Sequence, residues 1–359
     1  MTKTFDLKLL REALLIQCRF EDVQRVKPLV SGRRSGIVLT GRDSTALRAV
    51  AHDRDAPELI LADASAYSGK KRSTATDPFD ETWLQEQRSL GLPVLPNAGY
   101  IAAADTGGLK SILSRTAGVG SDAIAPLAVN SWWLDEAGGL DVLQDEIEAN
   151  SVPVAFVLEH LGDPLSVRRS LSGILRILEA STVPIIVLRC DISSIGLLCH
   201  GSYAAAVGTT TGLRHNYPIT NSPGGGRPAR IAAIVKQCLS YVAVEKIAFA
   251  VAADPENQMW ICECRTCLGQ KLDWIALLPT FALKEAAAFS HSIEVLLDLR
   301  DDLLSVNSDL TMRRRSWSSC CDNALFQLED VSDLSGPWRE PRMLTHWTAL
   351  SGPLWERVQ

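Results

Sequence analysis

The chain has 359 residues, of which 46% are hydrophobic, with a formal net charge of −6 and a mean hydropathy of +0.06. A chain of this kind can bury a large core, either as one barrel of about 250 residues with additions or as two domains. The acidic balance argues against a protein that coats nucleic acid by bulk electrostatics, and no uncharged apolar stretch reaches the ~18 residues of a membrane span. We therefore expect a soluble, cytoplasmic protein without a membrane partner.

The N-terminal segment, residues 1–35, begins with MTKTFDLKLLREALLIQ and mixes charged with apolar residues in an amphipathic pattern. It lacks a long apolar region followed by a small-residue cleavage site, so we predict no signal peptide. The pattern predicts a helical lead-in over 1–35. Nine cysteines without a secretory signal favour a reducing cytosol and a metal site over a disulfide framework.

Short apolar runs rich in β-forming residues recur between residues 36 and 250. They are 36–40, 58–63, 92–97, 123–129, 153–159, 184–189, 203–208 and 246–252. Segments between them carry apolar residues at helical spacing, as in 163–181, which starts with Asp163-Pro164. Eight strands alternating with helices predict a parallel sheet covered on both faces, hence an α/β fold with a (β/α)8 TIM-like barrel over 36–250. A doubly wound open sheet is the alternative.

Polar residues follow the carboxyl ends of several predicted strands. If the strands form a barrel, these residues gather on the rim where enzymes of this fold keep their chemistry. They include Asp63, Asn97, Asn130, Glu159, His160, Arg189 and Asp191. The run GTTTGLRH at 208–215 follows the seventh predicted strand, and Arg214 and His215 within it form either an anion site or a polar surface loop.

Three cysteines lie close together in the run ICECRTCLG. Cys262 and Cys264 are two positions apart and Cys267 follows three later, so one tight turn can aim three thiolates at a point. The stretch Phe281 to Leu304 has an apolar stripe typical of a helix, which can bring His291 to the turn. Three thiolates and one imidazole leave no open position, so this set predicts a structural zinc site in a subdomain spanning 251–304. Residues 305–359, rich in Trp, Arg and Pro, are predicted to form an irregular C-terminal tail.

A C-x-C-x-x-C cluster followed by a helical histidine, after a barrel pattern, resembles the zinc subdomain of the tRNA-guanine transglycosylase family. That family includes queuine and archaeosine enzymes and relatives that insert 7-deazaguanine into DNA. The resemblance implies a pentosyltransferase that exchanges a guanine in tRNA or DNA for a 7-deazaguanine base. It also implies structural Zn²⁺, whereas the oligomeric state, including a homodimer or a heterodimer, stays open.

The resemblance extends to individual residues of the predicted barrel. LILADASAY resembles the family's strand that ends in an acid, which places Asp63 in the acid role, and PVAFVLEHLGDP resembles its base-recognition strand. The family's nucleophilic aspartate lies on the last strand, where this chain has Ala206, and Asp191 one strand earlier is the candidate substitute. The implied catalytic residues are Asp63 and Asp191, and the implied substrate-binding residues are Asn97, Glu159, His160, Arg189, Arg214 and His215.

These residues leave two related functions open, and a third alternative is an unrelated barrel hydrolase or lyase. The first is a base-exchange enzyme, and the second is a non-catalytic paralogue that acts as a nucleic-acid-binding or partner subunit. Ala206 favours the second, whereas the polar rim favours the first. We expect Asp63 to lie within reach of Asp191, Glu159 or His160, and Ala206 to face the pocket at the rim.

Overall fold

The computed structural model describes residues 5–219, 230–305 and 308–351. The chain separates into two compact units, Met1–Ile219 and Thr220–Gln359. Within the described ranges, no helix combines the length and the apolar character needed to cross a membrane.

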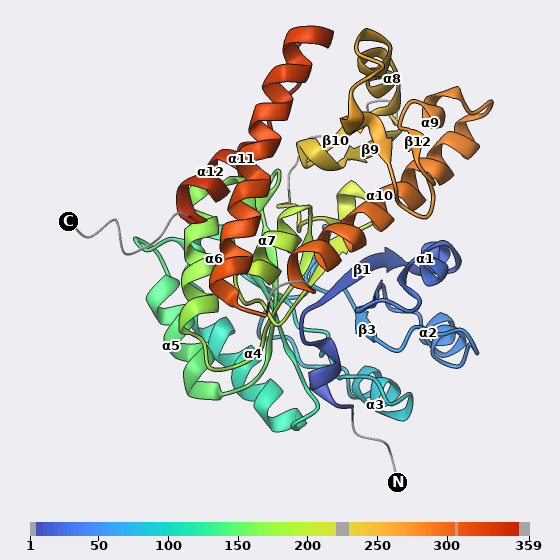
Figure 1. Cartoon of the computed structure of the whole chain (residues 1–359). Coiled ribbons are helices and arrows are strands. Elements are labelled where there is room, and N and C mark those ends of the chain that lie inside the picture. Colours follow the sequence, from blue (N-terminus) through green and yellow to red (C-terminus); the bar gives the residue numbers. More distant parts are fainter. Residues whose placement is uncertain (1–4, 220–229, 306–307, 352–359) are drawn as a thin grey trace. The chain divides into compact units, whose positions relative to one another are not determined.

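The first unit is built on eight parallel strands (Figure 1). They are β1 (Ala13–Arg19), β2 (Ser35–Thr40), β3 (Ile60–Asp63), β4 (Tyr100–Ile101), β5 (Ala125–Asn130), β6 (Val154–Glu159), β7 (Ile185–Cys190) and β8 (Ala204–Gly208). Their order in the sheet is β3-β2-β1-β8-β7-β6-β5-β4, so the first strand pairs with both the second and the last. No ladder joins β3 to β4 in the part of the chain that the structure describes, and the sheet is therefore a curled half-barrel.

Helices alternate with these strands and flank the sheet (Figure 1). Those of the first unit are α1 (Val23–Val30), α2 (Ser44–Ala51), α3 (Glu81–Ser89), α4 (Thr106–Val119), α5 (Leu140–Asn150), α6 (Arg168–Ala180) and α7 (Ser193–Cys199), with 3-10 turns η1 (Leu7–Leu10), η2 (Phe20–Asp22), η3 (Ser131–Leu134), η4 (Pro164–Ser166) and η5 (Thr211–Leu213). Aspartates cap α2, α3 and α4, because the side chains of Asp43, Asp80 and Asp105 accept hydrogen bonds from first-turn amides. These caps fix where each helix begins after its strand.

The core of the first unit lies inside the curled sheet. Residues of all eight strands point into it and form one buried cluster, which includes Leu15, Val38, Leu61, Tyr100, Ala128, Val157, Leu188 and Ala206. The intervening residues, such as Phe156 and Val187, are also buried. Burial on both faces explains why these strands are continuous apolar runs.

The second unit contains two small antiparallel hairpins and long helices. Its elements are β9 (Ala232–Val235), η6 (Lys236–Cys238), β10 (Ser240–Ala243), α8 (Val244–Ala253), η7 (Gln258–Trp260), β11 (Ile261–Cys262), β12 (Gln270–Lys271), α9 (Trp274–Leu277), α10 (Phe281–Leu304), α11 (Leu310–Ser335) and α12 (Arg342–Ser351). β9 pairs with β10, and β11 pairs with β12. The buried rings of Trp317 and Trp347 meet edge to face at 5.7 Å and join α11 to α12.

Six of the eight predicted strand runs are strands, and the helices predicted at 163–181 and Phe281–Leu304 are present. The prediction of a helical lead-in over 1–35 is wrong at its centre, since Ala13–Arg19 forms β1 of the sheet. A short, wholly apolar run fits a buried strand as well as a buried helix, and only the pairing with β2 and β8 decides between them.

Three further expectations differ from the structure. The run 246–252 lies within α8, because its alanines favour a helix as much as its valine and isoleucine favour a strand. The strand expected at 92–97 is a single bridge at Val94, and β4 follows it after the two prolines of the run. Within 305–359, the part that the structure describes is mostly helical, as α11 and α12, since buried residues recur along α11 at helical spacing.

Candidate metal centre and carboxyl-edge site

A group of four buried side chains in the second unit converges on one point. It consists of Cys262, Cys264, Cys267 and His291, and we name it the Cys3His centre. The four ligand atoms lie within 4.8 Å of one another, and the His291 Nδ1 atom lies 3.2–3.6 Å from the three sulfurs. A tetrahedral zinc with Zn–S of ~2.3 Å and Zn–N of ~2.0 Å places S and N about 3.5 Å apart. The donor set and its spacing therefore fit a zinc ion with no open position.

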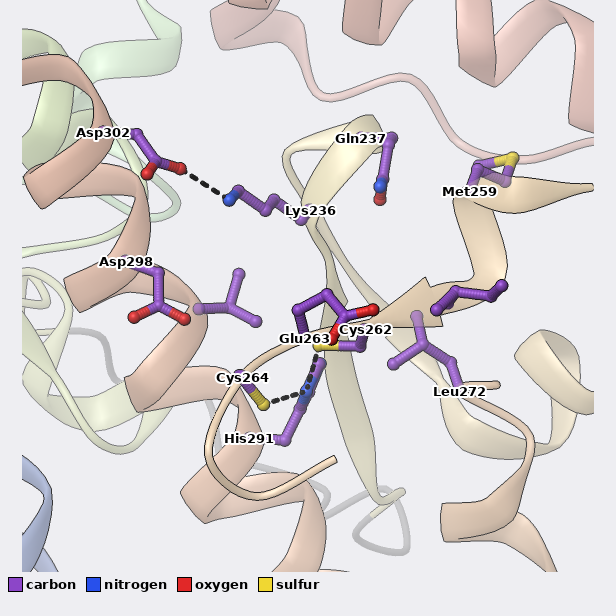
Figure 2. Close-up of a pocket in the computed structure, with 12 residues that line it drawn as sticks. Lys236, Gln237, Met259, Cys262, Glu263, Cys264, Leu272, His291, Asp298 and Asp302 are labelled. Carbon is purple, nitrogen blue, oxygen red and sulfur yellow. Dashed lines mark hydrogen bonds and ion pairs between the residues drawn. The ribbon is translucent and has the colours of Figure 1, made fainter. Parts of the chain in front are cut away.

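The local fold explains why the three sulfurs meet. The segment between β11 and β12 turns tightly, as the amides of Cys267 and Leu268 both donate to the Cys264 carbonyl and Gly269 donates to the Cys262 carbonyl. Gly269 has a φ of +81°, a left-handed conformation that suits glycine. The turn aims the sulfurs toward α10, from which His291 projects (Figure 2).

Surrounding groups hold the ligands in place. The second ring nitrogen of His291, Nε2, donates to the Ile234 carbonyl at 2.8 Å, which leaves Nδ1 as the metal-facing atom. The indole N–H of Trp274 donates to the Cys267 sulfur at 3.3 Å. Glu294, one turn after His291, accepts from the Thr266 amide at 2.8 Å and ties the cysteine turn to α10.

The three thiols perturb one another. Hydrogen bonds from Cys264 and Cys267 lower the pKa of Cys262 to about 3, whereas the same crowding raises the pKa of Cys267. Sulfurs held this close share their protons unevenly, and a divalent cation that replaces those protons relieves the crowding. The perturbed pKa values of the thiols, like the distances between the sulfurs and His291, therefore fit a metal-binding centre.

A second group of polar residues lies at the carboxyl edge of the first unit, where the strands of the curled sheet end. Asp63, the last residue of β3, is buried, and its carboxylate accepts hydrogen bonds from Gln17 at 2.9 Å, Tyr67 at 2.6 Å and the Ser65 amide at 2.8 Å. The Arg189 guanidinium lies 3.7 Å from the same carboxylate. The Asp63 carboxylate is consequently held by three hydrogen bonds and faces a guanidinium.

Arg189 is itself held in an unusual conformation. It lies in β7 with a φ of +53°, and its amide donates to the Gln17 side chain at 2.8 Å. Its guanidinium donates to the Ser65 hydroxyl at 2.5 Å, and Ser65 also has a positive φ, of 56°. Positive φ at a non-glycine residue costs about 1–3 kcal/mol, and residues held this way cluster at functional sites.

Glu159, the last residue of β6, has its own set of partners at this edge. Arg72 forms an ion pair with it at 2.5 Å, Tyr100 donates its hydroxyl to it, and Asn130 donates at 3.2 Å. The Arg72 guanidinium also stacks 3.5 Å from the centre of the Tyr100 ring. Burial, followed by the hydrogen bond to Glu159, raises the pKa of Tyr100, so its hydroxyl stays a donor.

The segments after β6, β7 and β8 bring a third set together. Asp191, directly after β7, lies 3.8 Å from Arg214 of the loop that follows β8. The neighbouring Asp163 has its pKa raised to about 7 by burial and by Asp191, whereas burial lowers the pKa of His215 to about 4. His160 accepts from the Gly162 amide through Nδ1, and its own amide donates to Asn216. At neutral pH His215 is therefore neutral, and Asp163 titrates close to neutrality.

The expected site residues therefore occupy the carboxyl edge in separate networks. No hydrogen bond or ion pair in the described ranges joins Asp63 to Asp191, Glu159 or His160. Asn97 takes no part in these networks and accepts from the Asp80 amide before α3. The expectation that Ala206 faces a pocket at the rim is wrong, because its side chain is fully buried inside the sheet.

Some residues of the edge were not singled out as site residues in the sequence. They are Gln17, Arg72, Tyr100 and Asp163, the last of which was predicted only to start a helix. Asn130, which directly follows a predicted strand run, was one of the polar strand-end residues named from the sequence, and it joins the Glu159 network. Gln17 lies inside an apolar run of β1, where an isolated amide is itself a sign of a buried polar contact.

Comparisons with known proteins identify no family. No family model matches the chain, and no curated protein matches it. Among solved structures, thiamine phosphate pyrophosphorylase from Pyrococcus furiosus is similar over 57% of this chain and 88% of its own, with 12% sequence identity and a TM-score of 0.33.

Proposed function

We propose that the chain is a tRNA-guanine transglycosylase-like protein whose first unit binds a guanine-type base at the carboxyl edge. In this proposal the curled sheet is a (β/α)8 TIM-like barrel, and Thr74, in the segment that follows β3, forms a parallel bridge to Tyr100 of β4. The Cys3His centre holds a structural zinc that ties the β11–β12 turn to α10. Such thiolates need a reducing compartment, so we place the protein in the cytoplasm.

The observation that carries the proposal is the arrangement of Asp63 and Arg189. Buried charges and two strained residues, Arg189 and Ser65, are concentrated at the edge where barrels keep their sites. An Asp63 carboxylate engaged by three donors and a guanidinium is oriented but is not a free nucleophile. This geometry favours the binding or partner subunit, which recognises a base in tRNA or DNA and forms no sugar adduct through Asp63.

A second candidate, base exchange with Asp191 as nucleophile, is favoured by one specific observation. Asp191 is a partly exposed carboxylate at the end of β7, and Asp163 beside it has its pKa raised to about 7. A nucleophilic carboxylate and a neighbouring acid with a raised pKa can divide the roles of nucleophile and general acid. The Asp191 side chain is 28% exposed, and attack on a sugar carbon requires an accessible carboxylate.

One experiment tests the proposal and separates the two candidates. Zinc-loaded full-length protein is incubated with labelled guanine alone, and then with labelled guanine and bulk tRNA or DNA. The non-catalytic binding function is supported if the protein binds guanine at equilibrium, if Asp63→Asn loses this binding, and if no label enters tRNA or DNA. The base-exchange enzyme is supported if labelled guanine enters the nucleic acid and if this incorporation is lost in Asp191→Asn. The control Asp141→Asn, at an exposed position on α5, should retain the incorporation. If the protein neither binds guanine nor incorporates the label, both candidate functions are refuted.

A further inference from the structure

Two buried donors at the carboxyl edge have no acceptor within the described ranges of the chain. They are the Nε atom of Arg189 and the Nδ2 atom of Asn216. The Arg189 residue is 5% exposed and Asn216 is 1% exposed. Leaving a buried donor unpaired costs folding free energy, so nearly all buried donors in proteins have a partner. Two unpaired donors at the edge where barrels keep their sites therefore point to an acceptor that a ligand supplies.

The register of the sheet places both residues beside the end of β6. The strand β7 pairs with β6 as far as Leu188, which lies opposite Val157. At Arg189, whose φ is +53°, β7 leaves β6, and Asn216 bridges the last residue of β6, Glu159. Two backbone hydrogen bonds to β6 and the residue after it, of 3.0 and 2.9 Å, hold Asn216 in this position. Arg189 and Asn216 are therefore neighbours along the same side of β6.

Both side chains point to the inside of the curled sheet. Bridged residues of parallel strands project to the same face, and Glu159 lies two positions after Val157 of the buried cluster. Asn216 therefore projects inward with Glu159. The Arg189 guanidinium lies 5.0 Å from the centre of the Tyr67 ring, which also belongs to the buried cluster. The two unpaired N–H groups thus lie at the carboxyl end of the interior.

The charged groups around these donors are already matched. The Arg189 guanidinium lies 3.7 Å from the Asp63 carboxylate, and Arg72 pairs with Glu159 at 2.5 Å. A phosphate dianion would bring two further negative charges to buried cations that already face carboxylates, at a large desolvation cost. A neutral carbonyl oxygen avoids this cost and can accept two hydrogen bonds through its two lone pairs. The unpaired donors consequently fit a ligand carbonyl better than an anion.

We propose that Asn216 and Arg189 donate to the 6-carbonyl oxygen of a purine base, and that this contact selects 6-oxopurines such as guanine. The inference rests on base binding at the carboxyl edge and assigns the residues that choose the base. A purine without this oxygen leaves both donors unpaired, and adenine presents an amino donor to them. Such ligands should therefore bind more weakly, although their rings are the same size.

Two purines that differ in this oxygen test the proposal. Equilibrium dialysis with labelled guanine gives one affinity, and the intrinsic fluorescence of 2-aminopurine, which lacks the 6-carbonyl, gives the other. The wild type should bind guanine at least about tenfold more tightly than 2-aminopurine. Asn216→Leu should weaken guanine binding about tenfold and change the 2-aminopurine affinity by less than about twofold. Asn216→Asp keeps the shape of the side chain but replaces the donor, and should lose at least as much guanine affinity.

The matched control is Asn150→Leu, because Asn150 lies at the end of α5 and donates to the Glu146 carbonyl of its own helix. It should change neither affinity by more than about twofold. Circular dichroism and the thermal midpoint establish that each variant is folded.

The outcomes separate this inference from the proposed function. Guanine binding that is lost in Asp63→Asn but is equal in wild type and both Asn216 variants would overturn the inference and leave base binding standing. Equal affinity of the wild type for the two purines would do the same. Displacement of guanine by inorganic phosphate in the wild type but not in Asn216→Leu would assign the donors to an anion and overturn the carbonyl contact. If the wild type binds neither purine, the inference fails together with the proposed base binding.

Discussion

At the scale of single residues, Gln17 connects the most constrained part of the carboxyl edge. Its amide donates to Thr40 and Asp63 and accepts from the Arg189 backbone, so one side chain links β1, β2, β3 and β7. The residue is fully buried. Each of its partners is also buried and would lose a hydrogen bond that no water replaces.

We therefore predict that Gln17→Leu lowers the free energy of unfolding by about 2–4 kcal/mol, since it leaves the Arg189 amide unsatisfied and removes one of the donors to the Asp63 carboxylate. Urea denaturation followed by circular dichroism measures the loss. Gln85→Leu, at an exposed position on α3, is the control and should change the value by less than about 0.5 kcal/mol. Equal effects of the two substitutions would contradict a linking role for Gln17.

Asp163 gives a prediction about pH. Burial and Asp191 raise its pKa from 3.8 to about 7, so the folded state favours the protonated form. Its contribution to stability is then fully present below pH 3.8 and is lost as the pH rises through about 7. His215, whose pKa is lowered to about 4, acts in the opposite direction and contributes stability above pH 6.5 that is lost as the pH falls through about 4.

A comparison of Asp163→Asn with wild type cancels the His215 contribution. Asparagine keeps the side-chain oxygen that caps η4 but carries no charge. We expect wild type and Asp163→Asn to have equal free energies of unfolding near pH 4. At pH 8 the variant should be more stable by roughly 2–4 kcal/mol. Denaturant midpoints across this pH range measure the difference. A difference that shrinks as the pH rises would show that Asp163 is not a buried acid.

At the scale of elements, the β11–β12 turn and α10 depend on the Cys3His centre. β11 and β12 are two residues each, too short to hold the turn without the metal. In the proposed zinc-bound state, the free energy of metal binding therefore contributes directly to the folding of this segment.

We predict that Cys264→Ser releases the zinc and lowers the thermal midpoint of the second unit by more than about 10 °C, because several kcal/mol of metal binding are lost. Cys320→Ser, a cysteine on α11 outside the centre, should retain one zinc per chain. Metal analysis by mass spectrometry and differential scanning calorimetry test both variants. A chain prepared without chelator that contains no zinc would refute the assignment of the centre.

At the scale of the whole molecule, the two units have separate cores. The buried interior cluster belongs to the curled sheet, and the metal centre belongs to Thr220–Gln359. Loss of the metal should therefore destabilise the segment around the Cys3His centre and leave the curled sheet unaffected.

Hydrogen exchange with mass spectrometry tests this separation on the intact chain. After treatment with a chelator, amides of β11, β12 and the first half of α10 should exchange at least about tenfold faster, since local unfolding no longer requires metal release. Amides of β1, β2 and β5 to β8 should keep their protection. Exchange that increases equally in both units would show that the metal stabilises the molecule as one cooperative body.

The sequence by itself determined six strands, α10 and the four ligands of the Cys3His centre. Each of these depends on local pattern: a continuous apolar run, a helical stripe, or thiols spaced for one tight turn. The placement of β1, α8, α11 and α12 was decided only by the tertiary structure. Their residues fit more than one local conformation, and the pairing or packing partner makes the choice.

The same distinction holds for the carboxyl edge. Strand-end polar residues such as Asp63, Glu159 and Arg189 could be named from the sequence, because parallel strands end at a common edge. Their partners could not, since Gln17 lies 172 positions from Arg189 and Arg72 lies 87 positions from Glu159. Whether a carboxylate is a free nucleophile or a fully engaged anion depends on such distant contacts, and only the folded chain brings them together.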